Sequence, residues 1–141
     1  MVPAFVRVLL SKKPYIAPPG IQIAPVELEV RKVKLSPRHL QQYREVCGVP
    51  SGIAVLPPAY LHTVAMPMHM QLFIANGFPV KVLGLIHLRN TIRVHKSVDV
   101  AVPLRLRVHF DTMRLTDAGQ EYDFTTRYEQ PNGSITPGTN P

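Results

Sequence analysis

The stretch Leu56–Phe78 (LPPAYLHTVAMPMHMQLFIANGF) decides how the rest of the chain is interpreted. The pair Pro57-Pro58 stands where proline is tolerated, before or within the first turn of a helix. The pair Asn76-Gly77 supplies a stop, because both residues accept the left-handed conformation. Apolar residues fall on every side of the helix between these ends, and such a helix is a buried one. The stretch therefore predicts a long buried helix, kinked or broken at Pro67, which lacks a backbone donor.

Length and composition indicate a single domain with its own core. Of the 141 residues 45% are apolar and 18% are charged, which excludes a disordered chain. A net charge of +7 suits an anionic ligand, but no Lys/Arg block exceeds two residues, so nucleic acid is not predicted. A membrane span is not predicted either, because Leu56–Phe78 contains three prolines, two histidines, a Gln and an Asn. The single cysteine, Cys47, excludes an internal disulfide and favours the cytoplasm. We expect it to be a buried structural residue.

The segments before the long helix show one strand and one short helix. Val26–Leu35 alternates apolar and charged residues, and its phase slips at Arg31-Lys32, which predicts a β-bulge. Ser36-Pro37 is typical of a helix start, and Gly48 of a helix end. Pro37–Cys47 is therefore predicted to be helical.

The segments after the long helix alternate in the manner of strands. The runs are Val82–Val94, Leu104–Leu115 and Gln120–Glu129, with turns at Thr116–Gly119 and Pro131–Gly133. The order predicts an α+β fold, in which a curved antiparallel sheet wraps around one long central helix. We assign residues 25–133 to this single domain, residues 1–24 to a proline-rich arm and residues 134–141 to a tail.

Four segments carry a resemblance to a known family: Tyr43–Gly48 (YREVCG), Leu56–His62 (LPPAYLH), Met66–Met70 (MPMHM) and Phe78–Asn90 (FPVKVLGLIHLRN). Together with the order of elements they resemble the MaoC-like acyl dehydratase/hydratase family, which has the hot-dog fold. The match is to the N-terminal half of its double hot-dog members and covers roughly residues 26–133.

This resemblance implies binding of acyl thioesters of coenzyme A or of acyl-carrier protein, with no other cofactor. Family members hydrate enoyl thioesters or dehydrate 3-hydroxyacyl thioesters, using an Asp and a His near the start of the helix to activate a water. Ile53–Leu61, before His62, contains no carboxylate. The chain therefore resembles a non-catalytic half, whose partner would be a second copy or a catalytic hot-dog domain. The alternatives are a binding or scaffold module without chemistry, and a hot-dog thioesterase, which would need a carboxylate that Ser51–Asn76 lacks.

Several side chains are candidates for contact with substrate. Methionines of the long helix are suited to a flexible acyl chain, although core packing is the commoner use. Gly84 allows close approach of a thioester to the backbone, and His87 stands where the family places a pocket residue. The alternative for the histidines is a hydrogen-bonded position in the core or on the sheet. The full set of candidates is His62, Met66, His69, Met70, Gly84, His87 and Arg89.

Metal binding by the histidines and phosphate binding by the arginines are two further possible functions. His62 and His69 are two helical turns apart, about 10 Å along the axis, so a shared metal ion is not expected. Four arginines either form a basic rim for the phosphates of coenzyme A or for an acidic carrier protein, or belong to the solvated face of a sheet. These arginines are Arg89, Arg93, Arg105 and Arg107.

Overall fold

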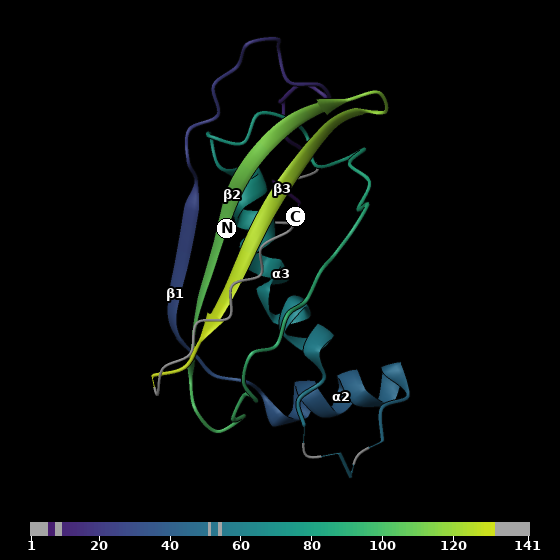
Figure 1. Ribbon diagram of the computed structural model, residues 1–141, viewed down its shortest axis with the longest axis vertical. Coiled ribbons are helices and arrows are strands. Elements are labelled where there is room, and N and C mark those ends of the chain that lie inside the picture. The colour runs from purple at the N-terminus through teal and green to yellow at the C-terminus, as the bar shows by residue number, and fades with distance from the viewer. Residues whose placement is uncertain (1–5, 8–9, 51, 54, 132–141) are drawn as a thin grey trace.

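A three-stranded antiparallel sheet lies against one long helix in the computed structural model (Figure 1), which describes residues 6–7, 10–50, 52–53 and 55–131. The sheet has the order β1-β2-β3, so β2 is the central strand and both of its edges are paired. The elements, in chain order, are β1 (Glu27–Val33), α2 (Pro37–Cys47), α3 (Pro58–Ile74), β2 (Leu104–Thr116) and β3 (Gly119–Glu129).

The two long strands form the hairpin that the sequence predicts. β2 and β3 pair from Arg105 with Glu129 to Thr116 with Gly119. The predicted bulge is also confirmed, because the pairing of β1 with β2 shifts between Val30 and Val33. Lys32 lies in the shifted segment with a φ of 61°, and an extra residue in one strand bends it and increases its twist.

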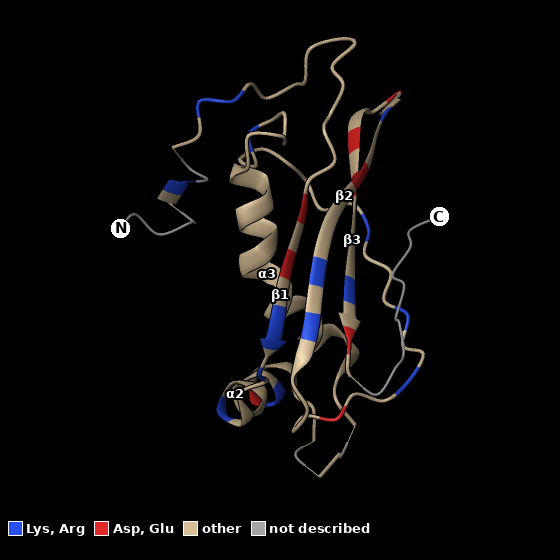
Figure 2. Ribbon diagram, turned by 90° about the vertical axis from the view of Figure 1, so that its left-hand side faces the viewer, with Lys and Arg blue, Asp and Glu red and all other residues tan. Residues whose placement is uncertain are grey.

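Alternation along β2 separates the core from the outer face of the sheet. Leu106 and Val108 are buried under α3, together with Leu104 and Phe110, whereas Arg105 and the other intervening residues point outward. Figure 2 shows the result: α3 carries no charged residue, and Arg and Glu follow one another along β1 and β2. The main core joins these strand residues to Ala65, Met68, Leu72, Phe78, Val80 and Ala17.

The short helix α2 has the predicted bounds and caps. The Ser36 hydroxyl accepts a hydrogen bond from the His39 backbone N–H at 3.2 Å, which satisfies one of the free donors of the first turn. Gly48 ends the helix in the left-handed conformation, with a φ of 64°. Cys47 is exposed, so the expectation of a buried cysteine was wrong. The reason is that Leu40 is the buried residue of α2, which lies on the surface.

The long helix α3 is continuous through Pro67, so the predicted alternative of a break was wrong. It is also not buried on every side. Tyr60, Ala65 and Leu72 are fully buried, whereas Met66 is 39% exposed and Pro67 lies on the exposed side. Apolar composition predicts which residues tolerate burial, but three strands cover only one face of a helix.

The strand predicted at Val82–Val94 is absent from the structure, which has no strand between Ile74 and Leu104 within the described residues. The segment is extended but makes no ladder, and Ile86 is 80% exposed. Alternation describes the two faces of an extended chain, but a strand also needs a free neighbouring edge. The outer edges of β1 and β3 are not paired with any strand of the described residues, and the segment follows neither of them.

The predicted arm and the predicted tail lie at the two ends of the chain. Ala17, within the predicted arm, is 1% exposed and belongs to the main core. The turn predicted beyond Pro131 and the tail at 134–141 lie outside the described residues. Over the part of the chain that the structure describes, no helix combines the length and the apolar character that crossing a membrane requires.

Candidate functional site

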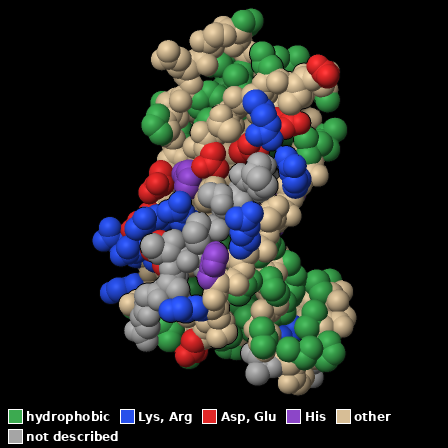
Figure 3. Space-filling view, viewed as in Figure 1, with side chains coloured by type: hydrophobic (Ala, Val, Ile, Leu, Met, Phe, Trp, Pro, Cys, Tyr) green, Lys and Arg blue, Asp and Glu red, His purple; other side chains and the backbone are tan. Residues whose placement is uncertain are grey.

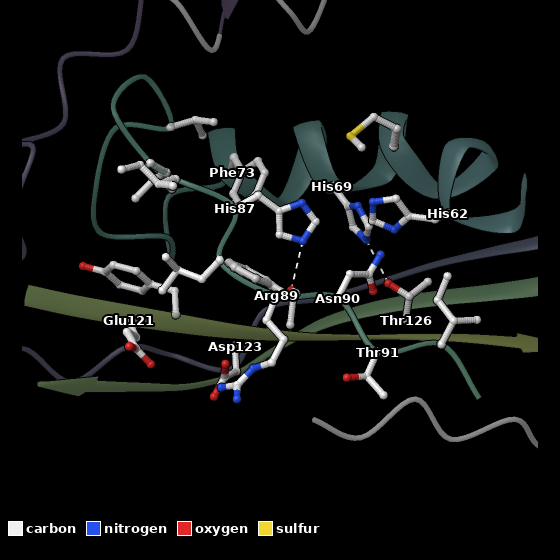
Figure 4. Close-up of a pocket in the computed structure, with 18 of the residues that line it drawn as sticks. His62, His69, Phe73, His87, Arg89, Asn90, Thr91, Glu121, Asp123 and Thr126 are labelled. Atoms are coloured by element: carbon white, nitrogen blue, oxygen red, sulfur yellow. Dashed lines mark hydrogen bonds between the residues drawn. The ribbon is translucent and has the colours of Figure 1, made fainter. Parts of the chain in front are cut away.

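A cavity of about 1340 Å³ lies between α3, β3 and the extended segment 82–98 (Figure 4). β3 supplies side chains from both of its faces, because it is an edge strand and the cavity reaches around it. One end, near the C-terminus of α3, is aromatic, with Phe73, Tyr122 and Phe124. The other end, near the N-terminus of α3, is lined by Leu56, Pro58, Leu61, Val98 and Tyr128.

The cavity brings together six of the seven candidate substrate residues. His62, Met66 and His69 reach it from α3, and Gly84, His87 and Arg89 line it from the extended segment. Met70 does not line the cavity, although it stands in the same helix. Of the three clustered methionines, Met68 is a core residue, which is the commoner use of methionine. Contact of the six residues with a substrate stays a prediction.

Three imidazoles meet in the middle of the cavity. The ring centres of His62 and His69 are 5.3 Å apart, and those of His62 and His87 are 6.0 Å apart. Figure 4 shows His62 and His69 projecting from α3 on the same side. The predicted separation of about 10 Å was wrong for the rings. The helical rise separates the two backbones, but each ring stands off the axis on two rotatable bonds and can lean toward the other.

Hydrogen bonds fix two of these rings. His69 Nε2 lies 2.8 Å from Thr126 Oγ1, which joins α3 to β3 across the cavity. His87 Nε2 lies 3.0 Å from the carbonyl oxygen of Arg89. A carbonyl only accepts, so Nε2 of His87 carries the proton and donates it.

The cavity favours neutral imidazoles. Burial, with smaller contributions from the charges of His62 and His87, lowers the pKa of His69 to about 4. Burial is also the largest cause of the lowered pKa of His62, followed by the charge of His87. Desolvation disfavours the charged form of an imidazole. At neutral pH His62 and His69 therefore each offer one N–H donor and one nitrogen acceptor.

Two carboxylates line the cavity from β3, but both are held by an arginine. Arg114 Nε donates to Glu121 Oε2 at 2.9 Å, and the same guanidinium pairs with Asp123. These ion pairs raise the pKa of Arg114, chiefly through the hydrogen bond with Asp123. Sequence reasoning missed both carboxylates, because it searched for an acid only before and along the long helix. The alternation of Gln120–Glu129 was the available signal, since it places Glu121 and Asp123 together on the face of the strand opposite Tyr122 and Phe124.

The four arginines of the expected basic rim occupy two different surfaces. Arg89 and Arg93 line the cavity. Arg105 and Arg107 lie on the outer face of the sheet, where Arg107 Nε is 2.9 Å from Glu29 Oε2. Figure 3 shows Lys and Arg side chains gathered over this outer face. The solvated-face interpretation is therefore right for Arg105 and Arg107, and the rim interpretation remains open for Arg89 and Arg93.

The cavity contains no metal-binding arrangement that the structure reveals. Among the described residues, no group of three or more His, Cys, Asp and Glu side chains is placed to hold a metal ion.

Comparisons with known proteins identify the fold. No protein-family profile matches the chain, and no curated protein matches it. Among solved structures the chain is similar to HtdX of Mycobacterium tuberculosis, with a TM-score of 0.70 and 23% sequence identity, over 79% of this chain and 47% of HtdX. The chain thus spans about half the length of that structure. Structural similarity at this sequence identity is evidence about the fold alone, and it confirms the prediction of an α+β hot-dog fold.

Proposed function

We propose that this chain is a hot-dog domain that binds acyl thioesters of coenzyme A or of acyl-carrier protein. We further propose that it acts as the non-catalytic half of an enoyl hydratase or 3-hydroxyacyl dehydratase. The observation that carries the proposal is the cavity, where neutral imidazoles occupy the middle and aromatic side chains occupy one end. Ligand sites are commonly apolar cavities with a few convergent polar groups.

The chemistry of a thioester suits this distribution of side chains. An acyl tail is apolar and fits the end lined by Phe73 and Phe124. A thioester carbonyl is a neutral acceptor, which the N–H of a neutral imidazole can satisfy without burying a charge. The phosphates of coenzyme A or of a carrier's prosthetic group are anionic, and Arg89 and Arg93 line the same cavity.

Support for a non-catalytic role comes from the partners of the polar groups. His69 and His87 are hydrogen-bonded to Thr126 and to the Arg89 carbonyl, and the carboxylates Glu121 and Asp123 pair with Arg114. Acid–base activation of water needs a free pair of titratable groups within hydrogen-bond reach of one water. The same observation favours the second candidate function, a binding or scaffold module for acyl thioesters without chemistry.

A partner hot-dog domain would cover apolar surface that this chain leaves open. Ile86 is 80% exposed and Leu88 is 70% exposed, and both belong to the segment that lines the cavity. Contiguous exposed apolar side chains mark interaction surfaces. HtdX is about twice as long as the part matched here, so a second copy or a catalytic hot-dog domain is the partner that we propose. With its single thiol unpaired, we expect the assembly in the cytoplasm.

The test is enoyl-thioester hydration, followed by the loss of crotonyl-CoA absorbance. The chain is assayed by itself, at ordinary and at high concentration, and together with a co-expressed catalytic hot-dog domain. The proposal predicts no turnover by the chain alone and a higher kcat/KM for the catalytic partner when the chain is present. Turnover by the chain alone overturns the non-catalytic assignment. Tight thioester binding with no effect on any partner supports the scaffold function instead.

A further inference from the structure

We infer that the N-terminal segment Lys13–Ala17, here called the strap, closes the aromatic end of the cavity and sets the length of acyl tail that the chain accepts. Tyr15 and Ile16 are the specificity-determining side chains, because both line the cavity. This inference rests on the proposed binding of acyl thioesters and adds a length limit to it.

The strap is fastened to β3 by a reciprocal pair of hydrogen bonds. The Ala17 backbone N–H donates to Gln120 Oε1 at 2.8 Å, and Gln120 Nε2 donates to the Ala17 carbonyl oxygen at 2.9 Å. The Ala17 side chain is 1% exposed and packs in the main core. One side-chain amide thus satisfies both backbone groups of a residue that has no strand to pair with.

The other end of the strap is fastened to the C-terminus of α3. Lys13 Nζ donates to the carbonyl oxygen of Phe73 at 2.9 Å and to that of Ala75 at 2.5 Å. The last carbonyls of a helix lack intrahelical partners, and a cation there also opposes the helix dipole. In addition, the Lys81 backbone N–H donates to the Pro14 carbonyl oxygen at 2.8 Å. The strap is therefore held at both ends before any ligand arrives.

Between these anchors Tyr15 packs on the turn that follows α3. The Lys81 ammonium lies 4.6 Å from the centre of the Tyr15 ring. A Cβ built on Gly84 would lie 3.6 Å from Tyr15 Cδ1, and Gly84 has a φ of +102°, which favours glycine. The ring is thus placed against the backbone at a position where no side chain intervenes.

The strap stands where a bound tail would end. His69 and Phe73 are one helical turn apart, about 6 Å along the axis of α3. A tail that leaves the imidazoles toward Phe73 runs along α3 to its C-terminus, the end to which Lys13 is bonded. Tyr15 is 62% exposed and Ile16 is 70% exposed, so each forms part of the rim and packs on one side only. Substitutions at these two positions therefore change the cavity without opening the core.

The experiment titrates the full chain calorimetrically with butyryl-, octanoyl- and palmitoyl-CoA. The variants are the double substitution Tyr15→Ala with Ile16→Ala, the filling substitution Ile16→Trp, and the control Leu10→Ala, at a position that is 71% exposed and does not line the cavity. The readout is the ratio of palmitoyl-CoA to octanoyl-CoA affinity. The double alanine variant should raise this ratio about fivefold or more, the effect of one or two additional buried methylene groups. Ile16→Trp should lower it, and the control should leave it unchanged.

Two failures are distinguishable in this design. If the wild-type chain binds the thioesters and the ratio is the same in every variant, the strap is not the end wall, and the proposed function stands. If no variant binds any of the three thioesters, the strap inference and the proposed function both fall.

Discussion

The imidazole of His69 and the hydroxyl of Thr126 meet across the cavity, with 2.8 Å between Nε2 and Oγ1. The contact joins the middle of α3 to the edge strand β3, and both residues line the cavity. It fixes the orientation of the His69 ring, whose pKa is lowered by burial to about 4. The position of the His69 ring within the imidazole cluster therefore depends on this hydrogen bond.

Removing the Thr126 hydroxyl should destabilise the fold. Thr126→Val keeps the shape of the side chain but leaves a ring nitrogen of His69 without its partner, and losing such a bond costs about 1–2 kcal/mol. The free energy of unfolding in urea measures this change. Thr126→Ser, which keeps the hydroxyl, is the matched control. Equal loss of stability in both variants would show that the hydrogen bond contributes nothing.

His69 should make the fold less stable in acid. Its pKa is lowered from 6.5 to about 4 by burial and by the neighbouring imidazoles, so between these values the unfolded chain binds the extra proton and the folded chain does not. Stability rises with pH wherever the unfolded state binds more protons. The contribution is therefore complete above about pH 6.5 and is lost as the pH falls toward 4.

The pH effect is isolated by a variant that cannot titrate. Between about pH 7 and about pH 5 the wild-type chain should lose about 2 kcal/mol more unfolding free energy than His69→Gln does. Urea unfolding curves at several pH values give both slopes. Parallel slopes for the two proteins would contradict a buried, neutral His69.

The anchor at the C-terminus of α3 makes a separate prediction about stability. Lys13→Met removes the ammonium that donates to the carbonyls of Phe73 and Ala75, which should cost about 1–2 kcal/mol. Lys12→Met removes the same charge from an exposed neighbour and should cost much less. Chemical denaturation of the two variants compares them. The anchor would be unimportant if both variants unfolded at the same urea concentration.

The local elements of this fold could be predicted because their signals are local. Ser36-Pro37 and Gly48 give the bounds of α2 at the residues where the structure has them. The phase slip at Arg31-Lys32 marks the bulge, and the turn residues between Leu115 and Gln120 mark the hairpin. Caps, turns and alternation each depend on a few neighbouring residues, so they can be recognised without knowledge of tertiary contacts.

Features that depend on contacts between residues far apart in the sequence could not be predicted. The alternation of Val82–Val94 is real, but the segment pairs with neither outer edge of the three-stranded sheet. The approach of the His62 and His69 rings depends on rotamers, and the pairing of Asp123 with Arg114 depends on the hairpin register. The sequence assigns Ala17 to a proline-rich arm, because its neighbours in sequence do not indicate that the Gln120 side chain binds it. Six of the seven candidate residues line the cavity, but most of the other lining residues and the geometry of the site could not be predicted.

The most direct test of the central claim, that the cavity binds an acyl thioester, is calorimetric titration of octanoyl-CoA into the full chain and into Met66→Trp. Met66 lines the cavity and is 39% exposed, so a larger side chain there fills ligand space without disturbing the core. Val46→Trp, at an 88% exposed position of α2 outside the cavity, is the control. The account predicts saturable binding by the wild-type chain and by Val46→Trp, and affinity about tenfold lower in Met66→Trp. Absence of binding to the wild-type chain, or equal affinity in all three proteins, would contradict it.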